Sequence, residues 1–86
     1  SSGVAGTVFP VPFRSTLTAV LTAAEKGRYT ISLADALGRT LRREQLEIGP
    51  EPRSWQLNNL GYLPSGLYYL RIQGQGQQAI TKIVKQ

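Results

Sequence analysis

The stretch Leu67-Tyr68-Tyr69-Leu70-Arg71-Ile72 decides the fold of this 86-residue chain. In an extended backbone Tyr68, Leu70 and Ile72 point to one side, and Tyr69 and Arg71 point to the other. Aromatic and β-branched residues at this spacing are typical of a strand with one buried face. The sequence Gly74-Gln75-Gly76 then predicts a tight turn into a second alternating stretch at residues 78–85. We therefore expect a β-hairpin in this part of the chain.

Alternation of the same kind recurs upstream, which predicts further strands. It is found at residues 17–23, 28–35, 40–46 and 54–57, and in the last of these Trp55 is in phase with Leu57, which favours the core. Turn-forming residues separate the segments at intervals of roughly 8–12 residues, and no segment has the pattern of a helix. The sequence therefore predicts an all-β fold, an antiparallel immunoglobulin-like β-sandwich of about seven short strands.

The beginning of the chain lacks such a pattern. Residues 1–7 are mostly small, so we interpret them as a linker or a cloning remnant, and we expect the ordered domain to span residues 8–86. Pro10 and Pro12 forbid a helix where this domain begins. An edge strand or a pinned loop is expected there.

Composition excludes much chemistry. The chain has no cysteine and no histidine, so it has no disulfide, no thiolate or imidazole metal ligand, and no histidine base. Hydrophobic residues make up 41% of it, but no apolar run approaches the roughly 20 residues of a membrane-spanning helix. We expect a non-enzymatic domain without metal or cofactor and without stable membrane insertion.

The charge is asymmetric along the chain. Residues 1–51 hold six basic and five acidic groups, whereas residues 52–86 hold Arg53, Arg71, Lys82 and Lys85 and no acid, out of a total net charge of +5. A basic C-terminal third favours an anionic partner. The cations are not clustered and no groove-reading motif accompanies them, so a nucleic-acid partner is not expected.

Two weaker patterns have structural explanations. The sequence Gly74-Gln75-Gly76-Gln77-Gln78-Ala79 formally matches a dinucleotide-binding loop, but a strand follows it where such a loop needs a helix. Trp55, Tyr62 and Tyr69 would form a sugar-binding row only if Trp55 were exposed, which its alternation with Leu57 argues against. Asp35 is interpreted as a turn-forming residue.

Four motifs in a fixed order resemble a known family. They are a proline motif with Phe9, Pro10, Pro12 and Phe13; a turn with Asp35, Gly38 and Arg39; the strand start Ser65-Gly66-Leu67-Tyr68; and the terminal Thr81-Lys82-Ile83-Val84-Lys85-Gln86. Together they are similar to the C-terminal sorting domain of the type IX (Por) secretion system. Val11 stands where that family usually has Asn, and Phe9 where it usually has Tyr.

The resemblance implies a sorting signal. Such domains are fused behind a cargo protein, pass through the periplasm, are recognised by the outer-membrane translocon, and are removed by a sortase-like protease as the cargo reaches the cell surface or the medium. On this basis the cleavage region would lie near residues 1–6, or ahead of them. The residues we assign to translocon recognition are Gly66, Tyr68, Lys82, Ile83, Val84 and Lys85.

The last strand suggests how recognition would work. The strand can pair through its edge with the sheet of a partner, and the charges of Lys82 and Lys85 would then help to select that partner. Alternatively, the two lysines only discourage aggregation through this edge. On the docking hypothesis a chain without residues 82–86 would remain soluble but would not be exported. Strand-mediated self-association is a further possibility, and a fibronectin-like adhesion module or a carbohydrate-binding module is the alternative function.

Overall fold

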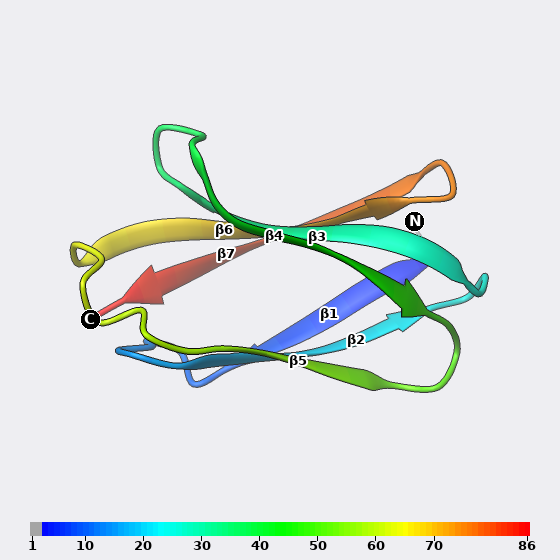
Figure 1. Cartoon of the computed structure of the whole chain (residues 1–86), viewed down its shortest axis with the longest axis horizontal. Helices are drawn as coiled ribbons and strands as arrows, with labels where there is room; N and C mark the ends of the chain where they lie inside the picture. Colours follow the sequence, from blue (N-terminus) through cyan, green and yellow to red (C-terminus); the bar gives the residue numbers. More distant parts are fainter. Residues whose placement is uncertain (1–2) are drawn as a thin grey trace.

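The computed structural model describes residues 3–86, which form two packed antiparallel sheets (Figure 1). One sheet has the order β1-β2-β5 and the other β4-β3-β6-β7. The strand bounds are β1 Val4–Phe9, β2 Leu17–Ala23, β3 Gly27–Asp35, β4 Thr40–Ile48, β5 Arg53–Leu57, β6 Gly66–Gly74 and β7 Gln77–Lys85. The sandwich measures 35 × 22 × 21 Å. Within residues 3–86 there is no helix of the length and apolarity needed to cross a membrane.

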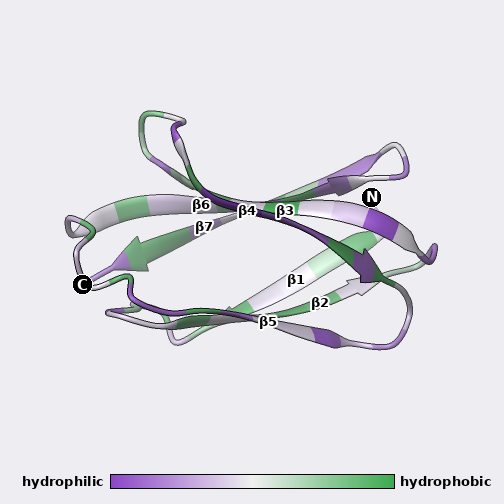
Figure 2. Ribbon diagram, in the orientation of Figure 1, coloured by the Kyte–Doolittle hydropathy of each residue, from purple (hydrophilic) through white to green (hydrophobic). Residues whose placement is uncertain are grey.

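The core forms because the alternating apolar residues of both sheets face each other. Leu17 and Leu21 of β2 and Ile31 and Leu33 of β3 are no more than 1% exposed. Figure 2 shows hydrophobic residues along β2, whereas the middle of β4 is hydrophilic. β4 carries a run of charged residues there, which is typical of an edge strand. The predicted all-β sandwich with seven strands is confirmed.

The start of the ordered chain differs from the expected linker over residues 1–7. Residues 4–7 belong to β1, which pairs with β2 from Val4 opposite Ala23 to Phe9 opposite Thr18. The small residues that suggested a linker have a packing role here. A Cβ on Gly6 would lie 2.9 Å from the Cδ1 of Ile72, so a larger residue here would require the Ile72 side chain of the other sheet to move. Residues 1 and 2 lie outside the described part of the chain.

The proline motif forms a loop anchored at its end. β1 ends at Phe9, and the peptide bonds before Pro10 and Pro12 are both cis. Phe13 then forms an isolated parallel bridge with Lys85 of β7. The pinned loop is confirmed for residues 10–13, and the edge strand for Val8 and Phe9, which end β1 at the edge of its sheet.

The packing can be tested with two isoleucines that differ in burial. Ile31 is 0% exposed and Ile80 is 53% exposed. We expect Ile31→Ala to lower the free energy of unfolding by about 2–5 kcal/mol, because the cavity cannot collapse within a close-packed core. Ile80→Ala should change it by less than about 0.5 kcal/mol. Denaturant unfolding of both variants measures the difference, and equal losses would contradict the assigned faces.

Candidate functional site

The sequence motifs meet at one end of the sandwich. We call it the motif end: the loops β1–β2, β3–β4 and β5–β6 together with the last residues of β7. The strand register brings them together, because Asp35 lies opposite Tyr68, Tyr68 opposite Ile83, and Gly66 opposite Lys85. β1 begins at the opposite end, as the separation of the two chain ends in Figure 1 shows.

Phe13 joins the two sheets at the motif end. Its backbone N–H donates to the carbonyl of Val84 (3.0 Å), and its carbonyl accepts from the N–H of Gln86 (2.9 Å). The Phe13 ring is fully buried and meets the ring of Tyr68 edge-on, with centroids 5.9 Å apart. The proline motif is thereby paired directly with the terminal motif.

Tyr68 extends this contact to the loop that precedes β6. Its hydroxyl donates to the carbonyl of Pro64 at 2.5 Å. Burial raises the pKa of the Tyr68 phenol, and the nearby Asp35 and Tyr62 act in the same direction, so the hydroxyl stays a proton donor. Gly66 has φ of +145°, a conformation that L side chains rarely adopt, which explains a glycine at this position.

The Asp35 motif forms a self-contained turn, as predicted. One carboxylate oxygen of Asp35 accepts from the backbone N–H groups of Leu37 (3.0 Å) and Arg39 (2.9 Å), and the other accepts from the Arg39 Nε at 2.7 Å. Gly38 supplies the positive φ of +87° that the turn needs. Partial burial acts to raise the pKa of Asp35, but the hydrogen bonds and charge of Arg39 and the Leu37 N–H together lower it.

The six residues assigned to translocon recognition fall into a buried group and an exposed group. Ile83, Tyr68 and Lys85 are 0%, 3% and 7% exposed, whereas Gly66, Lys82 and Val84 are exposed. The Lys85 ammonium donates to the backbone carbonyl of Gln86 (3.2 Å). Only the exposed three are available for direct contact with a partner, and the buried three hold the motif end together.

The edge of β7 is open for only part of its length. Phe13 already pairs with Val84 and Gln86, so strand addition is limited to residues 78–82 among those described. Removal of residues 82–86 would also take away Ile83 and the partners of Phe13. The expectation that this truncation stays soluble therefore conflicts with the packing, and the truncation cannot separate recognition from folding.

Sequence reasoning missed the exposed apolar side chains of the motif end. The large hydrophobic residues with high exposure are Phe9, Val11, Leu37, Tyr62, Leu67, Ile80 and Val84, and all except Ile80 lie at this end. Leu37, at the tip of the Asp35 turn, is 81% exposed. A groove of about 320 Å³ runs between this turn and residues 63–68. The available signal was a leucine at a turn tip, where a polar residue is usual.

The possible sugar-binding row does not form. Trp55 is 6% exposed, as its alternation predicted, and its Nε1 donates to the Glu44 carboxylate at 2.9 Å. The exposed Tyr62 accepts a hydrogen bond from Arg42, whose guanidinium lies 5.6 Å from the ring centroid. Within residues 3–86 no three potential metal ligands come together.

Comparison with known proteins gives one family. The model of the family described as "Secretion system C-terminal sorting domain" matches residues 7–86. Among solved structures, a β-glucosidase from Listeria innocua in complex with glucose is similar with a TM-score of 0.49 and 10% identity. That similarity covers 98% of this chain but 16% of the enzyme chain, so the chain spans only a small part of its length. No curated protein sequence matches significantly.

The Asp35 turn predicts a specific pH dependence. Because the pKa of Asp35 is lower in the folded chain, its contribution is present above the unfolded pKa of about 3.9 and is lost as pH falls through the folded pKa. Asp35→Asn should therefore destabilise the chain near pH 7 and much less near pH 2, on either side of that value. Denaturant midpoints at both pH values measure this, with Glu51→Gln in an exposed loop as control. A deficit of Asp35→Asn that does not shrink at low pH would contradict the role of the charge.

Proposed function

The chain belongs to the family of type IX secretion system C-terminal sorting domains, and from this membership we propose that it is recognised by the outer-membrane translocon through its motif end. Domains of this family direct export to the cell surface or the extracellular space and are sorting signals rather than enzymes. The observation that carries the proposal is the family match over residues 7–86. In the proposed sequence of events the cargo is fused ahead of β1, passes through the periplasm, and is separated from this domain by a sortase-like protease.

Two features favour the motif end as the recognised surface. The exposed large apolar side chains gather there, and exposed apolar patches of this kind mark interaction sites. A cargo fused ahead of β1 would leave from the opposite end of a sandwich 35 Å long, so it would not cover the motif end. Under this proposal Leu37, Leu67 and Val84 contact the translocon, while Phe13, Tyr68 and Ile83 hold them in place.

The pairing of β1 favours a cleavage site closer to the start of the chain than the sequence alone suggests. A protease needs an unpaired, extended segment. Residues 4–6 are paired with β2, and the carbonyl of Gly3 accepts from the N–H of Ala24, so these residues are poor substrates in the folded domain. The cleavage that the sequence places near residues 1–6 would then fall ahead of Gly3. Residues 1 and 2 are outside the described part.

Export of a reporter tests the function. A signal peptide and a fluorescent protein would be placed ahead of residues 1–86 and expressed in a type IX-competent host and in the same host without the translocon. We expect reporter outside the cell only in the competent strain, with the 9.4 kDa domain removed. Reporter retained in the periplasm of both strains would contradict the proposal.

A pair of matched variants tests the motif end itself. Leu37→Ser combined with Leu67→Ser removes two exposed apolar contacts from the groove, and we expect export to fall at least tenfold. The control is Ala5→Ser combined with Val20→Ser, on the outer face of the other sheet, which should leave export unchanged. Both variants should keep the free energy of unfolding within about 1 kcal/mol of the parent chain. Equal export by the two variants would show that the motif-end leucines are not the contact.

A further inference from the structure

The outer face of the β4-β3-β6-β7 sheet carries Leu67 and Val84 of the proposed motif-end contact at one end, and beyond them it has its own chemistry. Tyr29, Ile31 and Leu33 of β3 are buried, so the residues between them point outward, and the register places their neighbours on the same face. The outward residues of the four strands include Arg28, Thr30, Ser32, Ala34, Arg43, Gln45, Glu47, Tyr69, Arg71, Gln73, Gln78, Ile80 and Lys82.

Positive charge is concentrated on this face. It carries four cations against the single acid Glu47, a net of +3: Arg28, Arg43, Arg71 and Lys82. The outer face of the β1-β2-β5 sheet carries no charged residue along its strands: Ala5, Thr7, Phe9, Thr18, Val20, Thr22, Ser54 and Gln56. The charged residues of the strands are therefore unevenly divided between the two outer faces.

The cations of this face have no partners within residues 3–86, unlike most others in the chain. Arg39 pairs with Asp35, Arg42 donates to Tyr62, and Arg53 donates to the carbonyl of Glu47. No side-chain hydrogen bond or ion pair to a described residue is made by the four outer-face cations Arg28, Arg43, Arg71 and Lys82. Their donors are therefore available to a ligand without breaking a contact of the fold.

Two of these arginines flank a serine in one row across the sheet. Ser32 lies opposite Arg43 on one side and opposite Arg71 on the other, and Arg71 lies opposite Ile80. At a strand spacing of about 4.8 Å, the two arginine backbones are roughly 10 Å apart. Guanidinium groups at this separation can hold neighbouring carboxylates of one partner segment, each through paired N–H donors.

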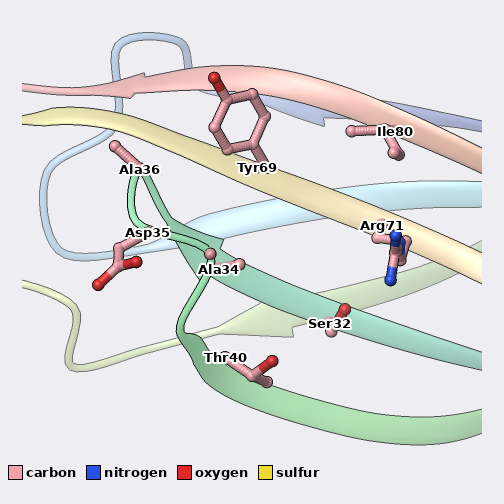
Figure 3. A pocket seen from close by; sticks show the side chains of 9 residues that line it. Ser32, Ala34, Asp35, Ala36, Thr40, Tyr69, Arg71 and Ile80 are labelled. Atoms are coloured by element: carbon pink, nitrogen blue, oxygen red, sulfur yellow. The ribbon is translucent and has the colours of Figure 1, made fainter.

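A hollow beside this row provides room for an apolar side chain. It has a volume of about 340 Å³ and lies where the small residues of β3 and the following turn leave space between larger neighbours. Figure 3 shows Tyr69, Arg71 and Ile80 standing beside Ser32, Ala34 and Thr40. The walls include an aromatic ring, an aliphatic side chain and an unpaired guanidinium. The Asp35 turn also lines the hollow, and there the Asp35 carboxylate is paired with Arg39.

We propose that this outer sheet face docks an acidic segment of a partner protein, with its carboxylates on Arg43 and Arg71 and an apolar side chain in the hollow beside Tyr69 and Ile80. Tyrosine and arginine interleaved with aliphatic residues are typical of protein interfaces. A nucleic acid would require a denser cationic track with several stacking rings. The proposed surface adjoins the motif end at the Asp35 turn, but Arg43, Arg71 and Ile80 lie outside it, and binding to them does not depend on export of the chain.

Binding of a defined probe to the whole 86-residue chain tests this surface. The probe is a short peptide of alternating glutamate and leucine, followed by NMR shifts of the backbone amides. A glutamine–leucine peptide, a single-stranded DNA oligonucleotide and phosphatidylglycerol vesicles are compared in parallel. We expect the glutamate peptide to shift amides around Ser32, Tyr69 and Ile80, to bind more tightly than the other three, and to weaken as salt is raised from about 50 to about 500 mM.

Charge-matched variants separate the effect of this face on peptide binding from the effect of the chain's net charge. Arg43→Gln with Arg71→Gln and the control Ser54→Glu with Gln56→Glu each lower the net charge by two, the second pair on the uncharged face. We expect at least a tenfold loss of peptide affinity in the first and less than threefold in the second. Equal losses, shifts on another surface, tighter binding of DNA or vesicles, or no binding of the glutamate peptide by the parent chain would overturn the proposal. The positions of the shifted amides in the parent chain test the proposal even if a variant does not fold.

Discussion

The pairing of Phe13 with the end of β7 is the contact on which the motif end depends. Two backbone hydrogen bonds tie Phe13 to Val84 and Gln86, and the buried ring packs on Tyr68, whose hydroxyl binds the carbonyl of Pro64. Three segments far apart in the sequence are thus connected through one aromatic pair. The loop before β6 and the end of β7 are placed by this connection, and with them the exposed residues around the groove.

The motifs that resemble the sorting family therefore act here mainly by building a surface. Asp35, Gly38 and Arg39 close a turn, and Tyr68 and Ile83 fill the core. What they present is a set of exposed apolar side chains, with Leu37 at the turn tip as the most exposed. The loop that carries Val11 is anchored at Phe13, through its bridge to Lys85.

The strands could be predicted from the sequence because alternation is a local pattern. In β2 and β3 the spacing of apolar residues is enough to indicate which side chains face the core. Long-range pairing has no such signal, so neither the bridge from Phe13 to Lys85 nor the burial of Lys85 was foreseeable. The start of β1 was missed because small residues suit both a linker and a closely packed strand. The cationic face could be recognised only from the strand register, because Arg43 and Arg71 come into one row on either side of Ser32.

Amide hydrogen exchange of the 86-residue chain, followed by NMR, tests the role of Phe13 most directly. The account predicts that the amides of Phe13 and Gln86 exchange as slowly as those of the β6–β7 ladder, because both donate in the bridge. The amide of Ile80, on the open part of the β7 edge, should exchange much faster. Rapid exchange of Phe13 and Gln86, at the rate of exposed loop residues, would show that the proline motif is not held to β7 and would contradict the account.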